Sequence, residues 1–283
     1  MKTRLLRTLL FTSLMMVAAC QSANPSLKLY VFDCGNLKSA NPAPLLERGV
    51  TTTDMSVAAY LVVHPRGTLM WDTGVVPDEM IQPGGTTSFR ATVQKTLQSQ
   101  LAEIGYRPSD ITYLALSHYH YDHSANSNLF ATSTWLVQKP ERELMFSGIL
   151  GPSSANAPAP DAVAMRFAAL QNSKTTLLDG DHDVFGDGSV VIVSTPGHTP
   201  GHQSLLVKLP KEGAILLSGD LYHYPAEREL KDFTPFAALG DPEKEKASKE
   251  KLEALLVKEH ATLWIQHDLI ANAKLKKSPA YYE

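Results

Sequence analysis

Short apolar runs recur along the chain and predict β-strands. They are rich in Val, Ile, Leu and aromatic residues, as strands usually are. The runs are LKLYVFDCG (27–35), MSVAAYLVV (55–63), TLMWDTG (68–74), ITYLALS (111–117), TWLVQ (134–138), SVVIVST (189–195), SLLVKL (204–209), AILLS (214–218) and ATLWI (261–265). The turn sequences HPRG (64–67) and PKEG (210–213) join two pairs of these runs.

Two stretches carry apolar residues at helical spacing. The first predicts a helix capped by Ser88 and stopped by Gly105. Its apolar positions are Phe89, Val93, Leu97, Leu101 and Ile104. The second helix begins at Asp241-Pro242, a cap followed by a first-turn proline. Its apolar line is Ala247, Leu252, Leu255 and Leu256. Strands in two groups with helices between them predict a layered α/β fold.

The first twenty residues have the pattern of a secretory signal: three basic residues, then the apolar run 9–19. This run is too short to span a membrane comfortably. The ending VAAC (17–20) resembles the lipobox of bacterial lipoproteins, in which the cysteine becomes the lipidated N-terminus. No Asp follows Cys20 directly, and by this resemblance that favours the periplasmic side of the outer membrane. The alternative is a plain signal peptide with an incidental cysteine.

Residues 21–27 are expected to be a linker, and residues 28–283 a single domain. The net charge is −3 and no basic cluster stands out, so we expect no nucleic-acid partner and no membrane contact except through a lipid on Cys20. The oligomeric state stays open, with a homodimer as one option. Cys34 is the remaining cysteine, which excludes an internal disulfide and favours a small buried thiol.

Candidate metal ligands follow four of the predicted strands. The loops after residues 117, 195, 218 and 266 begin with HYHYDH, PGH, GD and H. Functional groups are commonly built on loops at strand ends, so these side chains are expected to converge. Four ionisable groups in six residues after an apolar strand would be costly without partners. The expected ligands are His118, His120, Asp122, His123, His198, Asp220 and His267.

Two metal sites are expected from this set. His118, His120 and His198 would form one, while Asp122, His123 and His267 would form the other. Asp220 has two oxygens with which to bridge them. Two ions about 3.5–4 Å apart can share a hydroxide and polarise a carbonyl, which is hydrolysis without a Ser or Cys nucleophile. Zinc is the first choice of metal, with cobalt, manganese or iron as alternatives.

The motifs resemble those of the metallo-β-lactamase superfamily, and the resemblance extends over nearly all of the mature chain. They are WDTG (71–74), SHYHYDHSAN (117–126), TPGHTPGH (195–202), SGD (218–220) and QHD (266–268). The resemblance implies a four-layer αββα sandwich. It also makes Asp72 a residue that orients ligands without binding metal itself. His202, close to His198, is the weaker ligand candidate.

Within this superfamily, the chain is most similar to N-acyl homoserine lactonases, the quorum-quenching enzymes. LYVFDCGNLK, NLFATSTWLVQKPERELMF and the His-Asp pair after the last strand carry this resemblance. It implies a hydrolase in which the metal-bridging hydroxide opens the lactone ring, with Asp122 passing a proton to the leaving alkoxide. The alternatives are another hydrolase of this fold, acting on thioesters, β-lactams or other esters, and a non-catalytic metal-binding lipoprotein.

One departure from the lactonases concerns the donor to the substrate carbonyl. Those enzymes often carry a Tyr three residues after the bridging Asp, where this chain has His223. Tyr222 and Tyr224 flank it, so all three residues are candidates for the catalytic donor. The alternative for each is a partly buried side chain at a strand exit. The stretch GPSSANAPAP (151–160) is expected to be a surface loop, either plain or a lid.

Overall fold

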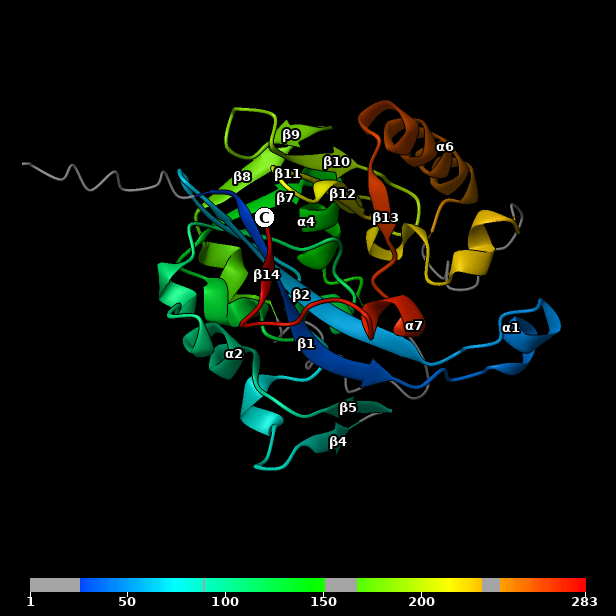
Figure 1. Cartoon of the computed structure of the whole chain (residues 1–283), viewed down its shortest axis with the longest axis horizontal. Helices are drawn as coiled ribbons and strands as arrows, with labels where there is room; N and C mark the ends of the chain where they lie inside the picture. Colours follow the sequence, from blue (N-terminus) through cyan, green and yellow to red (C-terminus); the bar gives the residue numbers. More distant parts are fainter. Residues whose placement is uncertain (1–25, 89, 151–166, 231–239) are drawn as a thin grey trace, which may run out of the picture.

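A computed structural model describes residues 26–88, 90–150, 167–230 and 240–283 of the chain (Figure 1). The predicted signal and lipidation site (1–20), most of the linker (21–27) and the stretch 151–160 lie outside these residues, so what was expected of them stays a prediction. None of the described helices combines the length and the apolar character that crossing a membrane requires.

Two β-sheets form the centre of the described structure. The strands of the larger sheet are, in order across it, β4 (Thr86–Ser88), β5 (Ala91–Val93), β1 (Lys28–Leu37), β2 (Met55–His64), β3 (Gly67–Trp71), β6 (Tyr113–Ala115), β7 (Thr134–Gln138) and β8 (Thr175–Leu178), with β14 (Tyr281–Tyr282) beside β1. The smaller sheet has the order β13 (Thr262–Trp264), β12 (Gly213–Leu217), β11 (Gln203–Leu209), β10 (Val190–Ser194) and β9 (His182–Asp183).

The alternation of side chains along these strands explains why the sheets stack. Leu205 and Val207 of β11 face the larger sheet, whereas Leu206 faces the opposite side. In β2, Tyr60 joins the layer between the sheets and Leu61 joins the layer on the outer face. Both faces of each sheet are therefore apolar, and both must be covered.

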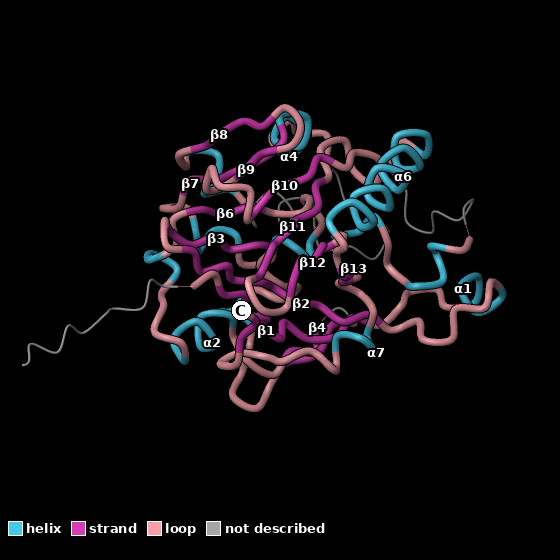
Figure 2. The backbone as a smooth tube through the Cα atoms, turned by 45° about the horizontal axis from the view of Figure 1, so that its top comes forward, coloured by secondary structure: helices cyan, strands magenta, loops and turns pink. Residues whose placement is uncertain are grey.

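Helices cover the two outer faces. The helices are α1 (Ala43–Glu47), α2 (Leu97–Glu103), α3 (Tyr121–Ser124), α4 (Lys139–Met145), α6 (Pro242–Glu259) and α7 (Leu269–Asn272). Leu101 of α2 and Met145 of α4 pack in the core layer of the larger sheet, while Leu252 and Leu256 of α6 pack on the smaller sheet. Figures 1 and 2 show α2 and α6 on opposite sides of the molecule. The predicted four-layer αββα sandwich is confirmed.

The predicted strands are found, but the first predicted helix is wrong at its start. The helix begins at Leu97, after the N-cap Thr96, whose hydroxyl accepts from the backbone N–H of Ser99. Val93, which fitted the helical spacing, instead lies in β5, paired with β4 and β1 at the edge of the sheet. Gly105 ends the helix with a φ of 81°, as predicted.

Two smaller expectations also change. The two prolines of segment 41–46 favour a loop, but the segment overlaps α1 (Ala43–Glu47). In α6, Ala247 is exposed, although it fitted the apolar line of that helix. Cys34 is buried and unpaired, as predicted, and burial raises the pKa of its thiol well above the usual value.

Strand directions place the ligand-bearing loops at one end of each sheet. In the smaller sheet, β12 is parallel to β13, and β10 runs in the same direction because both β10 and β12 are antiparallel to β11. The loops that follow β10, β12 and β13 therefore lie at the same end of the sheet. In the larger sheet, β3 and β6 are parallel, which brings Asp72 beside the loop that begins at Ser117.

We expect Leu252→Ala to lower the free energy of unfolding by about 2–5 kcal/mol, because it empties part of the apolar layer under α6. Leu252 is fully buried, whereas Val257 of the same helix is 75% exposed. Val257→Ala is the matched control and should change stability by less than about 0.5 kcal/mol. Denaturant unfolding measures both. Equal effects of the two substitutions would contradict the packing of α6 on the smaller sheet.

Candidate metal centre

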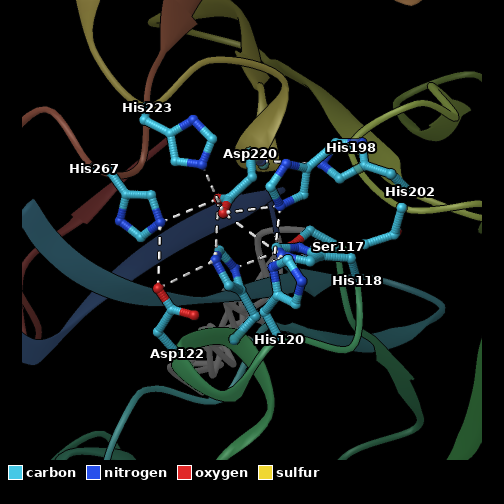
Figure 3. A network of polar contacts seen from close by, with 12 residues as sticks. Ser117, His118, His120, Asp122, His198, His202, Asp220, His223 and His267 are labelled. Atoms are coloured by element: carbon cyan, nitrogen blue, oxygen red, sulfur yellow. Dashed lines mark hydrogen bonds and ion pairs between the residues drawn. The ribbon is translucent and has the colours of Figure 1, made fainter. Parts of the chain in front are cut away.

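Side chains from both sheets meet at the edge where these loops emerge (Figure 3). They form two groups, and in each group one possible ligand atom per residue lies within 4.8 Å of those of the others. The first group is His118, His120, His198 and Asp220, and the second is Asp122, His123 and His267. The structure thus brings all seven predicted ligands close together, with Asp220 in the first group.

In the first group, two imidazole nitrogens lie at hydrogen-bond distance from a third. His118 Nε2 lies 2.7 Å from His120 Nδ1, and His198 Nε2 lies 3.0 Å from the same atom. Asp220 Oδ2 is 3.5 Å from both His118 Nε2 and His198 Nε2. Burial lowers the pKa of His120 to about 4 and those of His118 and His198 well below the usual value. Neutral imidazole is the form that binds metals.

The second group gathers around the other oxygen of Asp220. Asp220 Oδ1 lies 3.0 Å from His123 Nε2 and 3.1 Å from His267 Nε2. Asp122 Oδ2 lies 3.5 Å from His267 Nε2 and 3.9 Å from His123 Nε2. Each oxygen of Asp220 therefore faces one group, which is the arrangement a bridging ligand needs.

Three buried atoms in this second group fit a cation. Asp220 Oδ1, His123 Nε2 and His267 Nε2 make no hydrogen bond within the described residues, although they lie close together. Buried polar atoms are normally satisfied, and one divalent ion could satisfy all three. Burial alone would lower the pKa of His123, but the carboxylates of Asp220, Asp72 and Asp122 raise it well above the usual value. A divalent cation can supply the positive charge that these carboxylates attract.

Asp72 organises the loop that carries the first motif. Its carboxylate accepts from the backbone N–H of Ser117 (2.6 Å) and from the Ser117 hydroxyl (3.0 Å), and it lies 2.9 Å from His123 Nδ1. Asp72 is fully buried and has a φ of 57°, an unfavourable conformation for a residue with a Cβ. The side-chain network fixes this backbone, and it turns the Nε2 atom of His123 toward Asp220.

His202 supports the backbone of Asp220. Its Nε2 accepts from the backbone N–H of Asp220 at 3.0 Å, while its Nδ1 lies 3.0 Å from the carbonyl oxygen of Thr195. Both ring nitrogens are thereby engaged. A Cβ on Gly219 would lie 2.6 Å from His202 Nε2, so a glycine is needed there. His202 is thus a support for Asp220, in agreement with the preference for His198 as ligand.

Among the three candidate donors after Asp220, only the ring of His223 faces the ligands (Figure 3). His223 Nε2 lies 3.2 Å from Asp220 Oδ2. The Tyr222 hydroxyl donates to Glu253 (3.1 Å), and the Tyr224 hydroxyl donates to the carbonyl oxygen of Thr53 (2.8 Å). Both tyrosine hydroxyls are therefore engaged with other partners.

Sequence reasoning missed the buried carboxylate beside His223. Glu227 accepts from the backbone N–H of His223 at 3.0 Å, and its other oxygen lies 3.6 Å from His223 Nδ1. Burial alone would lower the pKa of His223, but the carboxylates of Asp220 and Glu227 raise it to about 10. The i, i+4 spacing of His223 and Glu227 was the available signal, but nothing in the sequence showed that Glu227 would be buried.

The comparison with known families agrees with this centre. The model of the metallo-beta-lactamase superfamily matches residues 52–267, a span that includes all seven side chains. The chain belongs to the metallo-beta-lactamase superfamily, and it is a metal-dependent hydrolase of the lactonase-like kind.

Individual relatives are N-acyl homoserine lactonases. The chain is 30% identical to the N-acyl homoserine lactonase AttM of Azorhizobium caulinodans, over 91% of this chain and 99% of that one. It is 28% identical to an N-acyl homoserine lactonase of a Bacillus species, over 81% and 87%. A solved N-acyl homoserine lactone hydrolase with N-hexanoyl-L-homoserine at its catalytic metal center has a TM-score of 0.68 and 26% identity, over 90% and 99%.

Replacing Asp220 with Ala should remove the shared ligand of both groups. We expect the wild-type protein to bind two ions per chain and Asp220→Ala to bind fewer than one, measured by elemental analysis after chelation and reloading. For each bound ion, wild-type stability should rise by about 2.7 kcal/mol when the metal is present at one hundred times its dissociation constant.

Asp181→Ala is the control, because Asp181 pairs with Lys251 on the surface. It should leave the metal content unchanged. Two ions per chain in Asp220→Ala would contradict the bridging position of this carboxylate.

Proposed function

We propose that the protein opens the lactone ring of N-acyl homoserine lactones, using two metal ions. The observation that supports this most is the pair of His/Asp groups that share Asp220, found in a chain whose curated relatives include such lactonases at 30% identity. The substrate class comes to this chain from those relatives. The alternative substrates, thioesters, β-lactams and other esters, require the same hydrolytic chemistry and are separated by experiment.

The ions would be held by the two groups, with one carboxylate common to both. Bound there, two divalent ions would supply Lewis acidity and a water-derived nucleophile near neutral pH. Zinc stays the predicted metal, with cobalt, manganese and iron as alternatives. Asp220 keeps the two groups together, and Asp72 and His202 keep His123 and Asp220 in orientation.

The reaction adds one water across the ester bond of the ring. The oxygen joins the carbonyl carbon, the bond to the ring oxygen breaks, and one proton must reach that ring oxygen. Asp122 has the position to carry this proton, because its carboxylate lies beside His123 and His267 at the edge of the second group. The product is a ring-opened acyl homoserine.

His223 is the candidate donor to the carbonyl oxygen of the substrate. Its ring reaches toward Asp220, and both neighbouring tyrosine hydroxyls are engaged elsewhere. The carboxylate of Glu227 lies behind the ring and fixes the backbone of the same residue. A donor held in this way can stabilise the charge that develops on the carbonyl oxygen.

The substrate proposal is tested by proton release from the metal-loaded protein without residues 1–20. Short- and long-chain N-acyl homoserine lactones should be hydrolysed, and a chelator should stop the reaction. A β-lactam and a thioester serve as comparison substrates. Turnover of a comparison substrate with no turnover of any lactone would overturn the lactonase assignment and leave the hydrolase assignment standing.

His223→Gln should lower kcat about a hundredfold or more, because it removes a donor to the developing oxyanion. Steady-state kinetics measures this, with metal content measured on the same sample. His182→Gln is the control, since His182 lies in the edge strand β9 of the smaller sheet, outside both groups. An unchanged kcat in His223→Gln would refute the donor role.

A further inference from the structure

A buried carboxylate outside both metal-binding groups connects the two loops that carry the histidines of the first group. Glu141 lies in the first turn of α4, directly after β7, and the residue is 2% exposed. Among the described residues, no cationic side chain forms an ion pair with Glu141. Burying a carboxylate without such a partner is costly, so its hydrogen bonds must compensate.

Three hydrogen bonds end on this carboxylate. Glu141 Oε1 accepts from the backbone N–H of Tyr119 at 2.8 Å. Glu141 Oε2 accepts from the Thr199 hydroxyl at 2.8 Å and from the backbone N–H of Gly201 at 2.9 Å. Tyr119 stands between His118 and His120, and Thr199 directly follows His198. One side chain thus contacts the backbone of both loops that carry imidazoles of the first group.

The fit around Glu141 leaves no room for adjustment. A Cβ on Gly201 would lie 2.5 Å from both the Cβ and the backbone nitrogen of Glu141, so the loop and α4 pack at glycine distance. Burial raises the pKa of Glu141 to about 7, although the three donors favour the carboxylate. At pH 8 the side chain is therefore an ionised acceptor on both oxygens.

The second group has other supports. His123 is oriented by Asp72, and His267 Nδ1 lies 2.8 Å from the carbonyl oxygen of Ser56. The three hydrogen bonds of Glu141 end on Tyr119, Thr199 and Gly201, and none of them ends on Asp122, His123 or His267. Glu141 therefore makes no direct hydrogen bond to a residue of the second group.

We propose that Glu141 is a positioning residue for the first group, and that the affinity of this group for its metal depends on it while the affinity of the second group does not. The residue acts through the backbone on either side of the histidines and contacts neither metal nor substrate. Partners that orient metal ligands typically contribute about 10–100-fold to metal affinity. This inference rests on the metal-binding part of the proposed function and is independent of the substrate.

Glu141→Gln is a sharp test because the amide keeps the size of the side chain. Both oxygens of Glu141 accept from a backbone N–H, so the NH₂ group of Gln must face a donor in either orientation. One of the two loops is then released. Glu143→Gln is the matched control, since Glu143 is an exposed residue of the same helix that pairs with Lys139.

The experiment is a Co²⁺ titration of the chelator-stripped proteins at pH 8, followed by visible absorption and by native mass spectrometry. Wild type and Glu143→Gln should bind two ions per chain. Glu141→Gln should bind the ion of the second group as tightly as wild type and the ion of the first group at least tenfold more weakly. The absorption bands of the ion in the first group should change. Thr199→Val, which removes a single donor, should weaken the same ion to a smaller extent and decides the question if Glu141→Gln does not fold.

Each result is decisive. Two ions bound with wild-type affinity and spectrum in Glu141→Gln, or in Thr199→Val when only that variant folds, would overturn the positioning role alone. Equal weakening of both ions would overturn the selectivity for the first group. A wild-type protein that binds no ion would overturn the proposed function and this inference together.

Discussion

The structure depends on one buried carboxylate surrounded by imidazoles. Asp220 lies within 3.5 Å of nitrogen atoms from five histidines, which are His118, His123, His198, His223 and His267. Burial alone would raise the pKa of this carboxyl, but His123 and His267, ahead of the other histidines, hold it well below the usual value. A charge buried in this way needs compensation. The imidazoles of the first group are neutral, so they can bind a cation that supplies it.

The sandwich fold brings the histidine side chains to Asp220. Two sheets with apolar side chains on both faces stack and are covered by helices, which fixes their edges relative to each other. Because of the strand directions, the loops after β6, β10, β12 and β13 lie close together. Supports such as Asp72 and His202 convert this rough convergence into a defined orientation of each ring.

Much of this could be predicted from the sequence, because strands and metal motifs leave local signals. Short apolar runs predicted the strands, and HYHYDH (118–123) indicated metal ligands. The helix start at Leu97 was missed because Val93 fits helical spacing yet lies in β5, which pairs with β4 and β1. Glu141 and Glu227 were missed for another reason: their roles arise from burial and from contacts with distant loops, which no local pattern records.

The central claim is that Asp220 joins two metal sites of a hydrolase. Anomalous X-ray diffraction at the zinc absorption edge, from crystals of the zinc-loaded protein, tests this most directly. The account predicts two anomalous peaks, one among His118, His120 and His198 and the other among Asp122, His123 and His267, with one oxygen of Asp220 directed at each. A single peak, or peaks away from Asp220, would contradict it.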